Sequence, residues 1–412
     1  GLIGNRTFTE AAGGNIFIDS NDIKILGSSS VSGGTISTQT SGIGNAGNIS
    51  ITTERLKILN QGIISSSTSD AGSAGNLIIN AQEKIEFTAP DPSPSSFSGI
   101  SFSGLSESGN AGNIVINTAR LVLRDGMLIS SSTFGNGNSG SITINASEAF
   151  EIGGARVRTN LDGSTATEGG IVRSAAILLT PLGRRFFGLP DVPGGDGGIV
   201  TINTPNLNLE DNGLITVRND GTGDAGNLII NAESISLNNQ GGITANTASG
   251  EGGNISLNLT SDLILRNNSL IDTEAMGTGN GGNITINSPV IAGFENSDII
   301  ANAVEGMGGN INITTSGIFG LQFRDEVTPE SDITASSQFG VNGTVEINNL
   351  SIDPSSGLVE LPVELTDSSQ KIASGCSSKT NSTFVATGRG GIPQNPNEQM
   401  HSNRTWSDIR DN

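Results

Sequence analysis

The residues of this sequence that could perform chemistry are mainly carboxylates. Four of them lie close to short apolar segments and the turns that follow, namely Asp220, Asp224, Asp272 and Glu274. Cleavage of a polysaccharide needs carboxylates that converge for acid and base roles, or a carboxylate set that holds calcium beside a basic side chain. These four do not recur at one position of the repeat described below, so they predict only a weak acidic groove. We therefore expect no enzyme, and keep a polysaccharide lyase or hydrolase as an alternative.

Histidine, cysteine and metal chemistry have few candidates. His401 is the single histidine and lies in a tail that we expect to be disordered past about residue 395. Cys376 is the single cysteine, so it cannot close a disulfide within the chain. The run Gly-Gly-Asp-Gly-Gly at 194–198 is one imperfect copy of a calcium-binding repeat. We predict no cofactor and no dedicated metal site.

A basic and aromatic cluster interrupts an otherwise acidic chain, whose net charge is −20. It contains Arg173, Arg184, Arg185, Phe186 and Phe187. One interpretation is a partner-contact loop, because aromatic rings and guanidinium groups are enriched at protein interfaces. The other, which we favour, is that the two phenylalanines fold back and cover the side of the structure.

The elements that must position these residues come from a repeat of about 28 residues. Each copy has a glycine, usually followed by Asn and then by apolar-x-apolar, which is the alternation of a strand with one buried face. A second alternation and a third apolar segment follow, so each copy predicts three short strands. The glycines are Gly14, Gly47, Gly75, Gly112, Gly140, Gly198, Gly226, Gly253, Gly282, Gly309 and Gly343.

Stacking of these copies predicts the fold, since a unit this small buries little surface alone. We expect an all-β, right-handed parallel β-helix, or solenoid, of about eleven coils with three short strands per coil, side loops and a C-terminal cap or tail. Residues 1–350 would form the β-helix. Insertions are expected at about 88–108, read as a flexible proline-containing loop, and at 161–195. Residues 351–412 would form the cap and a partly disordered tail.

Asparagine directly follows the glycine in eight of the eleven copies. Asparagine tolerates left-handed backbone, and amides stacked at one coil position can hydrogen-bond to one another. We predict a structural ladder of Asn15, Asn48, Asn76, Asn113, Asn227, Asn254, Asn283 and Asn310.

Composition excludes several partners. The chain has 40 acidic and 20 basic residues, so we expect no nucleic acid partner and no attraction to anionic lipid. No apolar run approaches the ~18 residues of a transmembrane helix, and we expect no membrane insertion. The chain begins at Gly1 without an initiator Met or a secretion signal, which we interpret as a fragment whose export signal lies upstream.

Several segments of the chain resemble a known family. These are the Gly-Asn-Ile-x-Ile repeats, Phe-Gly-Leu-Gln-Phe-Arg at 319–324 with Ser-Asp-Ile-Thr-Ala-Ser at 331–336, Gly-Leu-Val-Glu-Leu-Pro at 357–362, Gly-Cys at 375–376, and Thr-Gly-Arg-Gly-Gly at 387–391 before Pro-Gln-Asn-Pro. Together they are similar to the C-terminal part of cyanobacterial filamentous-haemagglutinin-like exoproteins.

The resemblance implies export by two-partner secretion through an outer-membrane transporter, and a location outside the cell or on its outer surface. Some relatives anchor through a C-terminal pair of cysteines, whereas this chain has Cys376 alone, which puts such anchoring in doubt. We expect a non-catalytic, adhesin-like filamentous rod that presents polar faces and loops to extracellular glycans or surface proteins. A purely structural sheath or matrix protein is a further alternative.

Overall fold

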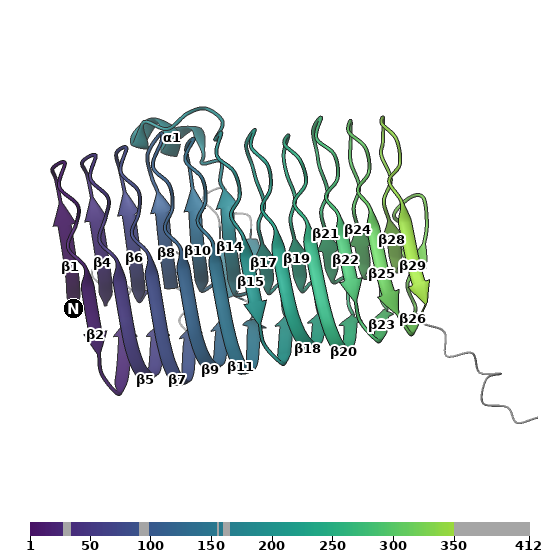
Figure 1. The fold of residues 1–412 in the computed structure, drawn as a ribbon, viewed down its shortest axis with the longest axis horizontal. Helices are drawn as coiled ribbons and strands as arrows, with labels where there is room; N and C mark the ends of the chain where they lie inside the picture. Colours follow the sequence, from purple (N-terminus) through teal and green to yellow (C-terminus); the bar gives the residue numbers. More distant parts are fainter. Residues whose placement is uncertain (28–33, 90–98, 155, 160–164, 350–412) are drawn as a thin grey trace, which may run out of the picture. The chain divides into compact units, whose positions relative to one another are not determined.

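The structure, a computed structural model, describes residues 1–27, 34–89, 99–154, 156–159 and 165–349. The chain divides into two units, Gly1–Ile352 and Asp353–Asn412, and every described residue belongs to the first. The predicted cap and tail at 351–412, with Cys376 and His401, therefore lie outside the described residues. The first unit is almost entirely β, with two long parallel sheets (Figure 1). This architecture is compatible with an all-β parallel solenoid.

One sheet contains twelve strands, which come from the third apolar segment of successive repeats. Its strands pair in parallel from one repeat to the next, except that β27 and β28 belong to the same repeat. In spatial order they are β1 (Leu2–Thr7), β4 (Thr35–Thr40), β6 (Ile63–Thr68), β8 (Gly99–Gly104), β10 (Leu128–Thr133), β14 (Ile171–Ala176), β17 (Leu214–Thr216), β19 (Gly242–Thr244), β21 (Leu270–Asp272), β24 (Asp298–Ile300), β28 (Asp332–Thr334) and β27 (Gln322–Phe323).

The other sheet contains fifteen strands, which come from the first two alternations of each repeat. They are β2 (Ile16–Asp19), β3 (Asp22–Leu26), β5 (Ile49–Leu59), β7 (Leu77–Thr88), β9 (Ile114–Arg124), β11 (Ile142–Gly153), β15 (Val200–Asn203), β16 (Asn206–Glu210), β18 (Leu228–Asn238), β20 (Ile255–Leu265), β22 (Ile284–Asn287), β23 (Val290–Gly293), β25 (Ile311–Thr315), β26 (Gly317–Phe319) and β29 (Val345–Asn349). Outside both sheets lie an antiparallel pair, β12 (Arg156–Thr159) and β13 (Thr165–Glu168), and one helix, α1 (Pro181–Phe187).

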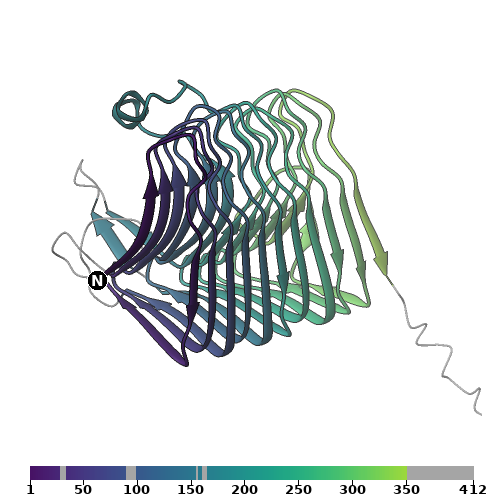
Figure 2. The same ribbon diagram turned by 60° about the vertical axis from the view of Figure 1, so that its left-hand side comes forward.

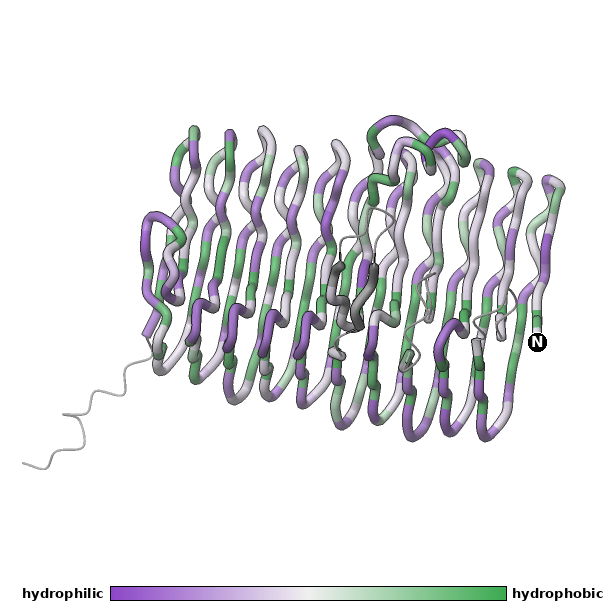
Figure 3. The backbone as a smooth tube through the Cα atoms, turned by 180° about the vertical axis from the view of Figure 1, so that it is seen from behind, coloured by the Kyte–Doolittle hydropathy of each residue, from purple (hydrophilic) through white to green (hydrophobic). Residues whose placement is uncertain are grey.

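The core lies between the two sheets, which form two walls of one stack (Figure 2). Apolar side chains recur at the same place in each repeat, so the hydrophobic stretches align along the stack (Figure 3). In the fifteen-stranded sheet, Ile255 lies between Leu228 and Ile284, and all three are buried. Burying such side chains fully contributes roughly 1.5–3 kcal/mol each, which is how a stack of small units becomes stable.

The repeat glycines allow adjacent turns to approach closely. A methyl group added at Gly253 would lie 1.9 Å from the carbonyl oxygen of Gly226 in the preceding repeat. Buried hydroxyls of the twelve-stranded sheet hydrogen-bond to the backbone of the same turns. Ser131 Oγ, for example, donates to the Gly112 carbonyl at 2.7 Å and accepts from the Gly140 amide at 3.0 Å. The glycine therefore serves close stacking, and the hydroxyl supplies hydrogen bonds for the turn.

The strand count per repeat differs from the expected three in several copies. In β11 and β18 the first two alternations form one continuous strand with a register shift in its middle. The two strands separate at Pro205 between β15 and β16, and at Pro289 between β22 and β23. Proline has no N–H to donate to the sheet, so it accounts for the break at these two places. β2 and β3, and β25 and β26, are also separate strands, although no proline lies between them.

The expected loop at 88–108 is wrong for its second half. Residues 99–104 form β8, with Ile100 and Phe102 buried and with parallel partners on both sides. The prolines of this segment fall at 90–94, within the stretch 90–98 that lies outside the described residues. The strand is difficult to predict from the sequence, because four of its six residues are serine or glycine and only two side chains are large and apolar.

The expected insertion at 161–195 is also too wide, because it contains β14. That strand pairs with β10 and β17 in the twelve-stranded sheet, and Val172 is buried in the core. The two inserted segments lie on either side of it, the β12–β13 pair before and the α1 segment after. The spacing of 58 residues between Gly140 and Gly198 therefore contains one enlarged repeat, since β11 pairs directly with β15 and β16.

Candidate ligand-binding site

The strands β8, β10 and β14 bring a polar row together on the outer face of the twelve-stranded sheet. Their register pairs Ser101 with Ser130, and Ser130 with Arg173, although 43 residues separate the last two. Ile100, Ile129 and Val172, one position earlier, belong to the core. Because alternate residues of a strand point to opposite faces, the serines and the arginine face away from the core.

The same register continues from β4 to β28, and we call this row of outward positions the outer column. It is defined by consecutive pairings between neighbouring strands and consists of Ser37, Ser65, Ser101, Ser130, Arg173, Thr216, Thr244, Asp272, Ile300 and Thr334.

The helix α1 begins immediately beyond β14 and lies outside the stack (Figure 2). Thr180 caps its first turn by accepting from the Gly183 amide at 3.3 Å, and Pro181 occupies the first turn, where no amide partner is needed. Gly188 ends the helix with φ of 65°, the left-handed conformation that glycine adopts most readily. A seven-residue helix is marginal in isolation, so its position depends on these caps and on its contacts.

A pocket of about 240 Å³ lies between α1 and the sheet, and we call it the α1 pocket. Its polar side is formed by the outward side chains of β8, β10 and β14, and its apolar side by residues of the turns and of α1. The polar members are Ser101, Ser103, Ser130, Ser132 and Arg173, and the apolar members are Leu105, Phe134, Leu179 and Phe187.

The polar side of the α1 pocket is ordered by its own hydrogen bonds. The hydroxyls of Ser130 and Ser132 lie 2.8 Å apart, and Arg173 Nε donates to Ser130 Oγ at 3.5 Å. Ser130 and Ser132 are almost fully buried, with exposed fractions of 2% and 1%. Serine hydroxyls both donate and accept, whereas a guanidinium only donates. Because Ser130 and Ser132 are bonded to each other, a ligand that carries both functions would be met mainly by Ser101, the least buried of the four serines.

The predicted cluster is divided by the structure into different environments. Arg173 and Phe187 line the α1 pocket. Arg184 is directed to its own segment, donating from Nη1 to the Leu179 carbonyl at 2.7 Å with Nη2 3.8 Å from Asp191. Arg185 and Phe186 are exposed, and the Phe186 side chain reaches an exposed fraction of 80% against 42% for Phe187. The two rings form an edge-to-face pair at 5.0 Å.

The two interpretations of this cluster, a cover over the sheet and a partner-contact loop, therefore apply to different residues. Phe187 covers part of the sheet, and Phe186 faces solvent. The four serines were missed by sequence reasoning. Their signal was the Ser-x-Ser alternation at 101–103 and 130–132, which places two hydroxyls on one face of each strand.

The predicted asparagine ladder occurs as two runs of amide contacts. In each run the side-chain oxygen of one asparagine accepts from the backbone amide of the next, at 2.7–3.3 Å. The runs are Asn15 to Asn113 and Asn227 to Asn310. Between them the position is occupied by Ser141 and Ile199.

A second asparagine ladder was missed. Its members follow the repeat glycine by five residues, and each member after the first donates from Nδ2 to Oδ1 of the preceding one at 2.7–3.0 Å. They are Asn80, Asn117, Asn145, Asn203, Asn231, Asn258 and Asn287. The recurring Asn one residue after the apolar pair was the available signal.

The carboxylates of the expected acidic groove do not share one site. Asp220 pairs with Arg218 at 3.2 Å. Asp224 accepts from the Glu251 amide, and its own amide donates to Asp196 Oδ1. Asp196 of the calcium-like run therefore serves a turn contact. Across the described ranges, no group of three or more His, Cys, Asp or Glu side chains is placed to hold a metal ion.

Asp272 and Glu274 are different, because both belong to the outer face beside β21. Burial raises the pKa of Asp272 to about 6, although a hydrogen bond from Asn246 Nδ2 at 2.6 Å acts in the opposite direction. Burial also raises the pKa of Glu274. A carboxyl with a pKa near neutrality is suited to proton transfer, and this pair is the strongest acid-base candidate among the residues that can be described.

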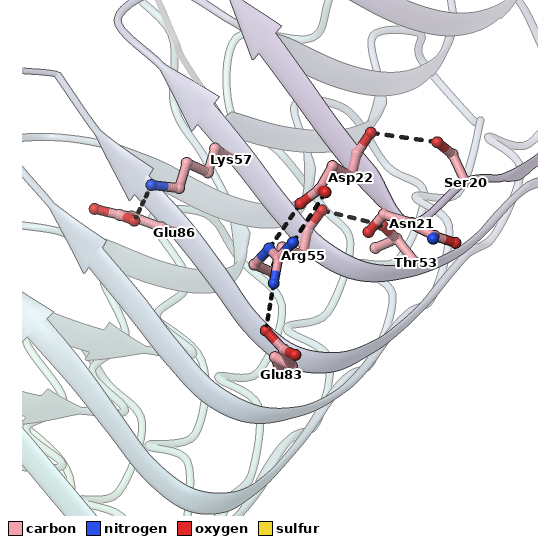
Figure 4. A network of polar contacts seen from close by, with 8 residues as sticks. All are labelled: Ser20, Asn21, Asp22, Thr53, Arg55, Lys57, Glu83 and Glu86. Atoms are coloured by element: carbon pink, nitrogen blue, oxygen red, sulfur yellow. Dashed lines mark hydrogen bonds and ion pairs between the residues drawn. The ribbon is translucent and has the colours of Figure 1, made fainter.

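The ion pairs on the fifteen-stranded sheet are structural by contrast (Figure 4). Arg55 bridges Asp22 at 2.7 Å and Glu83 at 2.8 Å, linking three successive repeats, and all three side chains are exposed. Exposed pairs of this kind contribute little to stability, because solvent and salt screen the two charges. They hold neighbouring repeats in register and form no enclosed surface.

No protein-family model, curated protein or solved structure matches this chain. The only helix within the described residues has seven residues, and none is long and apolar enough to cross a membrane.

Proposed function

We propose that this chain is part of a secreted or cell-surface, adhesin-like filamentous rod that is not an enzyme. In this proposal, residues 1–350 form a right-handed parallel β-helix of about eleven coils, and polar faces and side loops contact extracellular glycans or surface proteins. Export would use an outer-membrane transporter of two-partner secretion, as the resemblance of the sequence implies. The parallel pairing of successive repeats supports the rod, because such a stack keeps a fixed surface over many repeats.

The observation that carries an adhesive role over a purely structural one is the outward face of α1. Leu182 and Phe186 are four residues apart, so they lie on one side of the helix, and both are about 80% exposed. Arg185 is exposed beside them. A sheath protein needs no such group, whereas aromatic, leucine and arginine side chains are typical of a contact surface.

Asp272 and Glu274 keep a polysaccharide lyase or hydrolase as the second candidate. Both have raised pKa values and lie on the same face as the α1 pocket. Asp272 is nearly buried, with an exposed fraction of 5%, and accepts from the Glu274 amide as well as from Asn246. This bonding supports a structural role for its carboxylate, which is why catalysis ranks second.

Binding and cleavage can be separated in one experiment. The protein would be mixed with cell-surface polysaccharides and separated by size exclusion with light scattering, which gives the mass of each polysaccharide before and after incubation. We expect co-elution with unchanged polysaccharide mass. Shortened chains would support the enzyme, and absence of any association would favour the sheath.

The contact surface can be tested with a matched control. The double variant Leu182→Ala/Phe186→Ala should reduce binding to intact cells at least fivefold. Phe17→Ala serves as the control, because Phe17 has a similar exposed fraction, 78%, but lies on β2 away from α1. Equal binding by all three proteins would exclude the outward face of α1 as the adhesive surface.

A further inference from the structure

The α1 pocket differs from the outward face of α1 in both chemistry and shape. It joins a row of serine hydroxyls on the sheet to an apolar wall that includes Leu179 and Phe187. We propose that the α1 pocket binds one neutral pyranose residue of an extracellular polysaccharide. This names the ligand class of the proposed function and rests on it.

The two sides of the pocket select a sugar over other ligands. A pyranose carries hydroxyls that donate and accept, as serine hydroxyls do, and its C–H faces pack against aromatic and aliphatic side chains. A fatty acyl chain would leave the hydroxyls of Ser101 and Ser103 without ligand partners, whereas Ser132 is already bonded to Ser130. An inorganic anion would leave the apolar wall unused. A ring with polar edges and an apolar face matches both surfaces.

The size of the pocket limits the ligand to a single residue. Its volume of about 240 Å³ is roughly eight times the ~30 Å³ that a water molecule occupies in the liquid. Ligand sites for drug-sized molecules begin at roughly 300 Å³. One sugar ring therefore fits, and the rest of a polysaccharide chain would leave over the open side of the pocket.

The charge of the protein favours a neutral sugar. The chain carries a net charge of −20, so a polymer of uronic acids or sulfated sugars is repelled at long range. Within the pocket, Arg173 already donates to Ser130 and acts as a fixed part of the polar surface. The hydroxyls supply the selectivity for a neutral ring.

Neighbouring residues of α1 provide a matched pair of variants. Phe187 lines the pocket, whereas Phe186 is 80% exposed and is absent from its lining. Both lie outside the two sheets, so Phe187→Ala and Phe186→Ala should leave the core unchanged. A second pair lies on the sheet itself. Ser101 lines the pocket, and Ser65 is its direct neighbour in the outer column on β6.

The test is saturation-transfer NMR with the full chain, using the methyl glycosides of glucose, galactose, mannose and N-acetylglucosamine, and glucuronate as the charged probe. We expect at least one neutral glycoside to bind and glucuronate to bind more weakly. Phe187→Ala should weaken the bound glycoside at least tenfold and Ser101→Ala at least threefold. Phe186→Ala and Ser65→Ala should bind it as the wild type does. Thermal melts followed by circular dichroism check that each variant is folded.

Three results would overturn the pocket assignment. These are no binding of any neutral probe, unchanged binding by Phe187→Ala, and equal loss in Phe186→Ala. Preference for glucuronate would overturn the neutral class. The function proposed above fails separately. Shortened polysaccharide chains would contradict the proposed function even if a glycoside still binds in the α1 pocket. Loss of cell binding in Leu182→Ala/Phe186→Ala would support the proposed function even if the pocket bound no sugar.

Discussion

Two stretches of the outer column have the same backbone but opposite chemistry. Towards the N-terminus, Ser37, Ser65, Ser101 and Ser130 follow one another, and α1 encloses the last two in a pocket. Further along, the position is occupied by Asp272, which is buried without a helix above it. Uncharged hydroxyls can be enclosed while still serving a ligand, whereas an enclosed carboxylate must be satisfied or protonated. The α1 pocket therefore lies over serines of the outer column, with Arg173 as its one charged member.

The comparison assumes that the column passes unbroken through β14, and removing that strand should have the largest effect. Deleting residues 165–193 removes β14, which pairs on both sides and places Val172 in the core. We expect loss of the cooperative thermal transition and of the β-type circular dichroism. A transition like that of the wild type would show that β14 is dispensable to the stack.

The end of the sheet should be the next most sensitive region. Asp332 on β28 is fully buried and is paired with Arg324. Arg324→Ala leaves a buried carboxylate without its cation, which typically destabilises by about 3–5 kcal/mol. Chemical denaturation at neutral pH would measure this loss. Arg218→Ala is the control, because the Arg218–Asp220 pair is partly exposed and should contribute less than about 1 kcal/mol; equal effects would contradict the burial argument.

Asp272 should make stability depend on pH. Its folded pKa of about 6 lies above the ordinary value of 3.8, so its unfavourable contribution is absent below 3.8 and grows as the pH rises to 6. The difference corresponds to at most about 3 kcal/mol. Asp272→Asn should therefore stabilise the protein at pH 7 and not at pH 3.5. Asn246 Oδ1 is buried without a partner and could accept from the new amide after a flip.

Thermal melts across this pH range test the assignment. A stability difference between Asp272→Asn and wild type that stays constant from pH 3.5 to pH 7 would contradict a titrating Asp272. The pKa of Asp298 is also raised by burial, so part of the pH dependence should remain in the variant.

Removing α1 alone should have the smallest effect on stability. Ala176 and Asn219 occupy equivalent positions, as do Gly195 and Gly223. The turn from 176 to 195 spans nineteen positions, whereas the equivalent turn from 219 to 223 spans four. The first turn therefore has fifteen extra residues. Deleting residues 178–192 restores the shorter turn. We expect a change of less than about 1 kcal/mol, measured by denaturation, since no α1 residue is buried and Leu189 is the one residue of the deleted segment at the edge of burial.

The regular part of the fold was predictable from local sequence. Ile255 and its counterparts mark the buried face because each repeat presents the same alternation, and the glycine beside them indicates close stacking. Local sequence favours inserted loops at β8 and β14, because each strand contributes few large side chains to the core, such as Phe102 and Val172. Their place in the sheet depends on neighbouring strands, which a single segment cannot indicate.

The α1 pocket was only half predictable. Arg173 and Phe187 stood out as unusual residue types on an acidic chain. Ser101 and Ser130 did not, since serine is common in every repeat and gains meaning here only through strand register. Which of two adjacent phenylalanines faces the sheet depends on the entry angle of α1, and that is set by Thr180 and Gly188 rather than by apolar periodicity.

The head-to-tail amide ladders have a mechanical consequence. Their hydrogen bonds, like those of the sheets, link each repeat only to its neighbours, and most connect residues 27–29 positions apart. Under tension between the two ends of the stack these interfaces lie in series and carry the same force, so they break one interface at a time. Yielding would then proceed in steps, each releasing about 28 residues, or roughly 90–100 Å of extended chain. A tethered stack of this kind would lengthen under pull while the remaining repeats keep their surface.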